Sequence, residues 1–294
     1  MRREIIEQQS ASILSFLRWA YEEQQWQHYL RLYLATRSLL NMVPLHRERI
    51  EYPRWAAEAA QILGEHETQI RSLLKIARIY VYYREEETAQ QVYDQAQKLA
   101  QSVSLNPQAR SRVNKRLGTT KILLLIYTDQ VMEARHLIAA LLPYAQSPKH
   151  ASELSYYNAL CFHKLGEDEE AESMLITLLA QQDNDIGSMS LCRACTTLAE
   201  IYLAAKNDHA AHQVIERNLA TAIHMRDRYQ IARARKNLAR LHTLRGDIPA
   251  ARVSLVEAID LFERLGMRHE LAEARAELAG MDAPDAPMSG ASGA

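Results

Sequence analysis

The sequence predicts an all-α protein, a right-handed α-solenoid of antiparallel helix hairpins with a period of about 40 residues. Three observations support this fold class. Apolar residues recur at helical spacing along most of the chain. Only 9 glycines and 8 prolines occur among 294 residues, a composition that favours long uninterrupted helices. Small residues also return at one fixed spacing in successive segments, as a structural repeat requires.

Residues 1–64 are expected to form an N-terminal helical segment that packs on the repeat array. The three helices predicted there span Arg3–Glu22, Trp26–Asn41 and Leu45–Leu63. Pro53 either kinks the third helix or marks its effective start, because proline lacks the N–H that a helix interior needs.

Residues 65–280 are predicted to form about five hairpins. In each, a small or core residue in the first helix is followed twelve residues later by an alanine in the second. A side chain as small as a methyl group lets two helix axes approach closely where they cross. One hairpin alone cannot cover its apolar face, so the hairpins must stack. The five pairs are Ala77 and Ala89, Ile122 and Ala134, Ala159 and Ala171, Ala199 and Ala211, and Ala239 and Ala251.

Local signals mark several helix ends. Acidic runs at Glu85–Glu87 and Glu167–Glu170 are expected to open helices, where carboxylates compensate the exposed N–H groups. Asp247 is expected to cap a helix that carries Pro249 in its first turn. Residues 281–294 have no apolar face and are predicted to be a disordered tail.

The bulk composition restricts the class of partner. Lys plus Arg (35) and Asp plus Glu (36) nearly cancel, so the whole molecule has no charge preference for nucleic acid or acidic membrane. No apolar run is long enough to span a membrane, and no signal peptide is evident. The 3 cysteines are too few for a disulfide framework. We therefore expect a cytoplasmic protein.

The pattern of the hairpins resembles the tetratricopeptide repeat. Ile76, Ala77, Tyr80, Ala89, Tyr93 and Ala96 match its motif best. Successive second alanines are 45, 37, 40 and 40 residues apart, longer than the usual spacing of about 34. Such lengthened repeats resemble those at the C-termini of the signal-transduction ATPases with numerous domains (the STAND class), which include maltose-type transcriptional regulators and bacterial NB-ARC proteins. The segment Ile13–Leu40 is similar to the one that joins the nucleotide-binding half to the repeats in those ATPases.

This resemblance implies a regulatory binding module, not an enzyme. The chain has no G-x-x-x-x-G-K-[ST] phosphate-binding loop, so it is not itself the ATPase. We expect it to capture a protein, peptide or small anionic effector and to transmit that event to an ATPase module in the same or another chain. Two alternatives remain open at this point, a stand-alone adaptor and a nucleic-acid-binding protein that uses a basic groove.

Candidate metal and catalytic residues are few. Cys192 and Cys195 form a C-x-x-C, and Cys161 with His163 could complete a zinc set. The two pairs are expected at opposite ends of neighbouring helices, about 10 Å apart along the axes, so packed core thiols are the simpler interpretation. His209 and His212 share a helix face and are expected to be solvated. We expect no cofactor, no metal and no catalytic residue.

In tetratricopeptide proteins the first helices of the hairpins line a concave groove. The corresponding positions of this sequence form a candidate binding groove rich in cations and tyrosines, with Glu153 and Glu200 as exceptions. Forked guanidinium groups beside aromatic rings suit carboxylate or phosphate groups. An ordinary solvated helix face would have the same composition. The groove residues are Arg71, Arg78, Tyr82, Arg116, Tyr127, Tyr156, His163, Lys164, Arg193, Arg233, Lys236 and Arg240.

Overall fold

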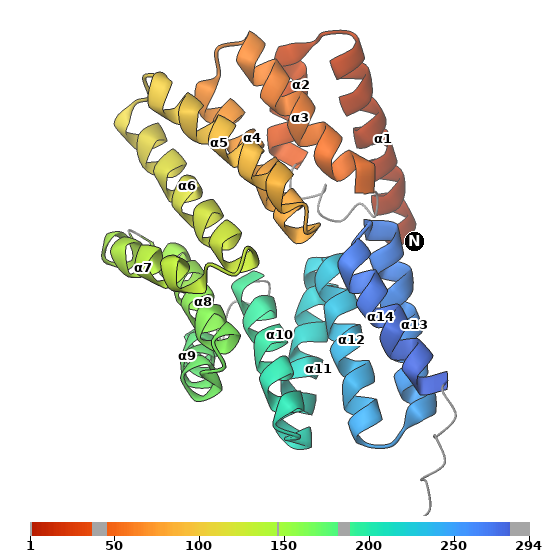
Figure 1. The fold of residues 1–294 in the computed structure, drawn as a ribbon. Coiled ribbons are helices and arrows are strands. Elements are labelled where there is room, and N and C mark those ends of the chain that lie inside the picture. Colours follow the sequence, from red (N-terminus) through yellow and green to blue (C-terminus); the bar gives the residue numbers. More distant parts are fainter. Residues whose placement is uncertain (1, 37–45, 146, 182–188, 283–294) are drawn as a thin grey trace, which may run out of the picture.

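The computed structural model describes residues 2–36, 46–145, 147–181 and 189–282, and these residues contain helices and turns but no strand (Figure 1). The prediction of an all-α solenoid is confirmed. The helices are α1 (Arg2–Glu22), α2 (Trp26–Thr36), α3 (His46–Ile62), α4 (His66–Tyr82), α5 (Glu86–Ser102), α6 (Pro107–Tyr127), α7 (Val131–Leu141), the 3-10 turn η2 (Leu142–Tyr144), α8 (Pro148–Lys164), α9 (Asp168–Ala180), α10 (Met189–Ala204), α11 (Asp208–Met225), α12 (Arg228–Leu244), α13 (Ile248–Leu265) and α14 (Arg268–Asp282).

Each hairpin turns through three residues, and the middle residue has a positive φ. After α8, Gly166 has a φ of 79°, and the N–H of Glu167 donates to the carbonyl of Phe162 at 3.0 Å. After α12, Gly246 has a φ of 76°, and the N–H of Asp247 donates to His242 at 2.9 Å. Glycine adopts this left-handed backbone without steric cost, and the hydrogen bond closes the helix end. The middle residues of these turns are Gln24, Gly64, Arg84, Asp129, Gly166, Lys206 and Gly246.

The residues predicted to meet at the helix crossings, twelve positions apart in the sequence, are buried in the structure. All five pairs that the sequence identified, from Ala77 and Ala89 to Ala239 and Ala251, have an exposed fraction of 0%. In every case the first member lies seven residues before the positive-φ residue of the turn. The regular turn therefore fixes which two residues meet, and a small side chain there permits close packing.

The N-terminal helices follow the same register with larger side chains. Leu17 of α1 lies seven residues before Gln24, and Tyr29 of α2 lies twelve residues after Leu17; both are fully buried. The hydroxyl of Tyr29 donates to the carbonyl of Tyr52 in α3 at 2.7 Å. On its other side, α3 contributes Ala57 to the core formed around α4. Helix α3 thus connects the N-terminal segment to the repeats, and residue 64, where we expected that segment to end, lies in the α3–α4 turn.

The remaining boundaries differ slightly from those expected. Pro53 lies within α3, which begins at His46. Asp247 caps α13 by accepting from the N–H of Ala250 at 3.1 Å, as expected. Helix α14 includes Met281 and Asp282, which we had assigned to the tail. Residues 283–294, and the expected end of the second helix at Asn41, lie outside the described residues.

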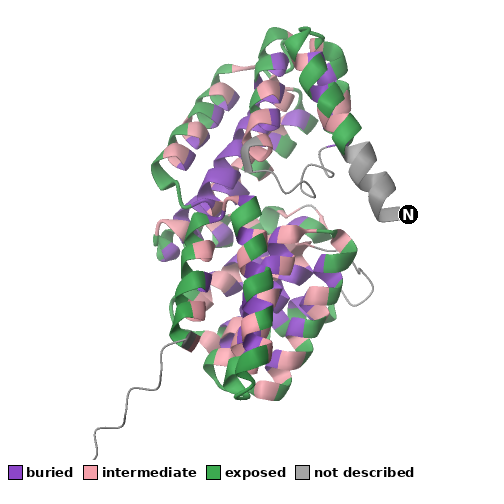
Figure 2. Cartoon of the chain, turned by 90° about the vertical axis from the view of Figure 1, so that its right-hand side faces the viewer, coloured by how far each residue is buried: buried purple, intermediate pink, exposed green. Residues whose placement is uncertain are grey.

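The chain coils back on itself, so its C-terminal hairpins meet helix α4 (Figure 1). Ile79 and Tyr83 of α4 share a hydrophobic cluster with Tyr229 of α12 and Phe262 of α13. Figure 2 shows that the buried residues lie on the sides of the helices that face neighbouring helices. Because the two ends of the array meet, the inner face of the solenoid is enclosed in the middle.

Candidate functional site

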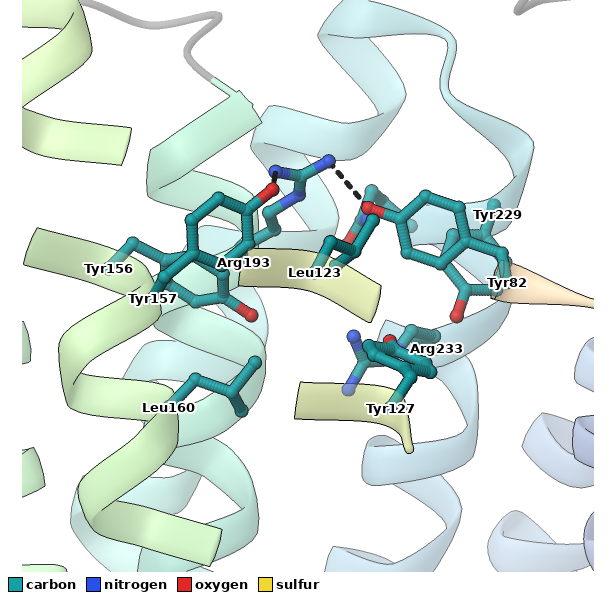
Figure 3. Close-up of a pocket in the computed structure, with 10 residues that line it drawn as sticks. Tyr82, Leu123, Tyr127, Tyr156, Tyr157, Leu160, Arg193, Tyr229 and Arg233 are labelled. Carbon is teal, nitrogen blue, oxygen red and sulfur yellow. Dashed lines mark hydrogen bonds between the residues drawn. The ribbon is translucent and has the colours of Figure 1, made fainter. Parts of the chain in front are cut away.

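The first helices of the five hairpins bring tyrosines and arginines together on the inner face of the solenoid. Helices α4, α6, α8, α10 and α12 all contribute, so the group exists only when the whole array has coiled (Figure 3). We call it the central cluster; it consists of Arg78, Tyr82, Tyr127, Tyr156, Tyr157, Arg193, Tyr229 and Arg233.

Arg193 of α10, in the fourth hairpin, is bonded to the first and third hairpins of the array. Its Nη2 donates to the hydroxyl of Tyr82 in α4 at 2.8 Å, although the two residues are 111 positions apart in the sequence. Its Nη1 donates to the hydroxyl of Tyr157 in α8 at 3.4 Å (Figure 3). One guanidinium therefore links three helices by hydrogen bonds whose directions fix their relative positions.

Arg78 of α4 donates to the same Tyr157 hydroxyl as Arg193 does. Its Nη2 donates to Tyr157 at 3.0 Å and lies 3.5 Å from a carboxylate oxygen of Glu153, one turn earlier in α8. Arg78 is 9% exposed, so its charge is compensated by these internal partners and not by bulk water.

Aromatic rings fill most of the space between the helices. The ring of Tyr82 lies 5.9 Å from that of Tyr127, edge to face, and 5.9 Å from that of Tyr229. The remaining space, which Gln230 also lines, has room for about one water molecule. The central cluster is therefore a closed connection between helices and not an open pocket for a small molecule.

The protonation states of the cluster suit hydrogen bonding. Burial raises the pKa of Tyr156 to about 12 and raises the pKa values of Tyr127 and Tyr229 as well. Burial alone would lower the pKa of Arg233, but Glu200, whose carboxylate lies 2.8 Å away, helps to hold it well above its ordinary value. These phenols are thus neutral and the guanidinium is charged at neutral pH.

Several predicted groove residues are less accessible than we expected. Arg78, Tyr156 and Lys236 have exposed fractions of 9%, 5% and 6%. The prediction that this face is exposed was wrong for these three residues, because the array coils tightly enough for facing helices to cover them.

Carboxylates that the sequence analysis did not include neutralise much of the predicted basic stripe. Glu67 pairs with Arg71 at 3.2 Å. Acidic residues of helix α14 pair with basic residues of α12: Glu273 lies 2.6 Å from Lys236, and Glu277 lies 2.6 Å from Arg240. The signal was present in the spacing of Glu270, Glu273 and Glu277, which places them on one helix face.

Three further predicted groove residues lie outside the central cluster. Nδ1 of His163 is 2.6 Å from Asp168, across the α8–α9 turn. Nζ of Lys164 is 4.0 Å from the exposed Asp129. Arg116 of α6 is exposed to solvent. The structure thus brings six of the predicted residues together in the central cluster and leaves the other six outside it. The six in the cluster are Arg78, Tyr82, Tyr127, Tyr156, Arg193 and Arg233.

The cysteines are core residues. Cys161, Cys192 and Cys195 are all fully buried, and burial raises the pKa of each thiol to about 12. Neutral thiols in such positions pack as small apolar side chains. Within the ranges that the structure describes, no three His, Cys, Asp or Glu residues are grouped so that they could hold a metal ion.

Comparison with known proteins defines the fold but not a family. No protein-family model matches the chain, and no curated protein matches it. A Rap protein complexed with Competence and Sporulation Factor is similar in structure, with a TM-score of 0.55 and 15% identity over 92% of this chain and 75% of that one. BtubC (BKLC) from P. vanneervenii matches with a TM-score of 0.49 and 17% identity, over 84% of this chain and 97% of that one. The likeness to the Rap protein confirms a helical-repeat fold of tetratricopeptide type.

None of the described helices is both long and apolar enough to cross a membrane.

Proposed function

We propose that this chain is a non-enzymatic binding scaffold that holds a protein, peptide or anionic effector on its inner face. The observation that carries the proposal is the central cluster, to which five helices contribute and in which hydrogen bonds from arginines to tyrosine hydroxyls join three of them, α4, α8 and α10. A partner with carboxylate or carbonyl oxygens can replace such bonds with its own, because the donors prefer charged acceptors to phenols. A protein of the same fold, the Rap protein, was solved in complex with another factor, which supports this use of the fold.

Partner binding would act on the curvature of the array. The hydrogen bond between Arg193 and Tyr82 joins α10 to α4. A partner that binds either side chain in place of the other breaks this bond and favours a more open arrangement of the array. A ligand shifts such an equilibrium only by its difference in affinity for the two arrangements. A partner that competes for the side chains of the central cluster binds the open arrangement more tightly, and this supplies the difference in affinity.

We further propose that the scaffold is the sensing arm of a STAND-type signalling or transcription regulator. The support is the resemblance of the lengthened repeats and of Ile13–Leu40 to the corresponding regions of those ATPases. Opening of the array would then be transmitted to a nucleotide-binding module in the same or another chain.

Nucleic-acid binding has less support. The basic stripe that suggested it is compensated from within, since Arg71, Arg233 and Lys236 each pair with a carboxylate. Phosphate-backbone recognition relies on cations that are available to release counterions. The stand-alone adaptor remains the main alternative, because it needs the same inner face without an ATPase.

A capture experiment tests the binding proposal. The full chain is immobilised, proteins and peptides are captured from native lysate, and the captured species is then titrated with purified chain. The variant Arg71→Glu with Arg116→Glu reverses two cations on the inner-face helices α4 and α6. The control is Arg264→Glu with Arg275→Glu, at positions whose side chains are 58% and 55% exposed on α13 and α14.

The proposal predicts that the control binds as the natural chain does and that the inner-face variant loses the partner. Equal binding by both variants would contradict it. The sensing-arm proposal is tested separately, by adding the partner to a nucleotide-binding module encoded in the same reading frame or an adjacent gene. A change in its ATP hydrolysis is expected; unchanged hydrolysis with intact capture would indicate an adaptor.

A further inference from the structure

Four basic residues lie at one edge of the central cluster, where Arg71, Arg78 and Arg116 depend on two carboxylates, those of Glu67 and Glu153. Arg71, Lys75 and Arg78 lie at positions i, i+4 and i+7 of α4 and therefore on one helix face. Desolvation by neighbouring groups and the charges of Arg78 and Arg71 lower the pKa of Arg116 in α6, although part of this side chain reaches solvent, so the three guanidiniums lie near one another. We call these four residues the basic cluster.

The carboxylates near the basic cluster are already shared. Glu67 accepts from Arg71 and also from Arg112, which it binds through both oxygens at 2.7 Å. Glu153 is influenced by the charges of Arg78, Arg193, Arg116 and Lys115 together, and they lower its pKa although burial opposes this. One carboxylate cannot provide two-point contacts to so many cations, so the group retains capacity for another anion.

Unused hydrogen-bonding capacity at Arg78 points the same way. Nη1 of Arg78 is buried and has no hydrogen-bond partner among the described residues, and the whole residue is only 9% exposed. Nη1 of Arg49 in α3 is also buried without a hydrogen-bond partner among the described residues, and the charge of Arg49 also acts on Lys75. A buried donor without an acceptor is costly in a native protein, and an anion that occupies the site would remove that cost.

We propose that the basic cluster is an anion subsite that receives a carboxylate or phosphate group of the molecule held on the inner face. This inference rests on the proposed function, since it names the chemistry of one end of the partner. The exposed Arg116 provides access from solvent, and the buried Arg78 provides the inner contact. The forked donors of the two guanidiniums match the oxygen atoms of such a group.

Proton uptake should accompany anion binding, because Lys75 is only partly protonated at neutral pH in the free protein. Burial and the charges of Arg49 of α3, Arg78 of α4 and Arg116 of α6 lower the pKa of Lys75 to about 7, against a smaller opposite effect of Asp227 before α12. An anion beside the amine favours its charged form and raises that pKa again. The structure therefore links anion binding to protonation of this lysine.

The test uses inorganic phosphate and succinate as probes, with sodium chloride at equal ionic strength as reference. Binding to the full chain is measured by calorimetry at pH 7.5 in two buffers of different ionisation enthalpy. We expect both the affinity and the proton uptake to fall in Lys75→Met, and the affinity to fall about tenfold in Arg116→Gln, as loss of a charge-assisted contact predicts. Arg264→Gln, an equal change of charge at an exposed position of α13, is the control and should bind as the natural chain does.

Glu153→Gln gives the opposite prediction. Removing the carboxylate that now serves several cations should tighten anion binding, and phosphate should raise the melting temperature of this variant more than that of the natural chain. Preference for phosphate or for succinate identifies the group that the subsite takes. The inference is overturned if neither anion binds the natural chain more tightly than Arg116→Gln, or if Glu153→Gln binds no better. Because no partner is present in this assay, its failure leaves the capture experiment to decide the proposed function.

Discussion

The guanidinium of Arg193 donates to the hydroxyl of Tyr82 at 2.8 Å, across 111 residues of sequence and between helices α10 and α4. This contact joins the fourth hairpin to the first at the inner face of the solenoid. The hydrophobic contact of Ile79 and Tyr83 with Tyr229 lies beside it, so the closure combines apolar packing with directed hydrogen bonds.

Removing the Tyr82 hydroxyl should weaken the closure. Tyr82→Phe leaves Arg193 with the longer bond to Tyr157 and an unsatisfied donor, a loss of about 1–3 kcal/mol in the free energy of unfolding. Urea denaturation followed by circular dichroism measures it. Tyr144→Phe is the control, because Tyr144 is 76% exposed and its hydroxyl can bond to water. Equal stability of the two variants would show that the hydrogen bond adds nothing to the fold.

The alanines at the helix crossings should not tolerate a larger side chain. Ala199→Leu or Ala239→Leu forces extra methyl groups into a crossing with no exposed surface, and overpacking of this kind costs about 1–3 kcal/mol. Ala220→Leu places the same side chain at an exposed position of α11 and should change little. Thermal melts of the three variants test the register; no loss at Ala199 or Ala239 would refute it.

Helix α14 should depend on its ion pairs with α12. Glu277→Gln removes the carboxylate that lies 2.6 Å from Arg240 and 3.5 Å from the buried Lys236. Leaving a buried ammonium less well compensated should cost about 1–3 kcal/mol. Glu263→Gln breaks an exposed pair with Arg275, for which a loss of about 0–1 kcal/mol is expected. Hydrogen exchange in α14 reports the difference, and equal protection in both variants would contradict this role for Glu277.

Stability should increase with pH near neutrality because of Lys75. In the unfolded chain this amine stays protonated up to about pH 10.5, whereas its pKa in the folded chain is about 7. The unfolded state therefore binds more protons above pH 7, and the free energy of unfolding should rise by about 1 kcal/mol between pH 6 and pH 8. Urea melts in buffers without phosphate measure this rise. It should shrink in Lys75→Met, and an unchanged pH dependence in that variant would exclude Lys75 as its source.

The parts of the fold that depend on local sequence were predictable. The pair Ala77 and Ala89 could be recognised because a three-residue turn fixes a spacing of twelve, and small residues mark the crossing. The same geometry between α1 and α2 was not recognised, because Leu17 and Tyr29 occupy the crossing and carry no small-residue signal.

The site was predictable only as a set of residue types. Arg78 and Arg193 could be placed on the inner face, but their shared bond to Tyr157 depends on how far successive hairpins rotate, a property of the whole array. Likewise, Lys236 of α12 is neutralised by Glu273 in α14, one repeat later, and this pairing depends on how successive repeats pack on one another. Exposure of a helix face cannot be derived from the helix alone when another turn of the solenoid covers it.

The closure of the solenoid is tested most directly by the distance between spin labels on its two ends. Gln91→Cys on α5 and Val256→Cys on α13 are exposed positions, and the natural cysteines are buried with high thiol pKa values, so labelling is selective. Pulsed electron paramagnetic resonance should give one narrow distance distribution for the natural background. In Tyr82→Phe with Arg193→Met it should broaden toward longer distances. A broad distribution in the natural background, or the same narrow one in both, would contradict a solenoid held closed by this contact.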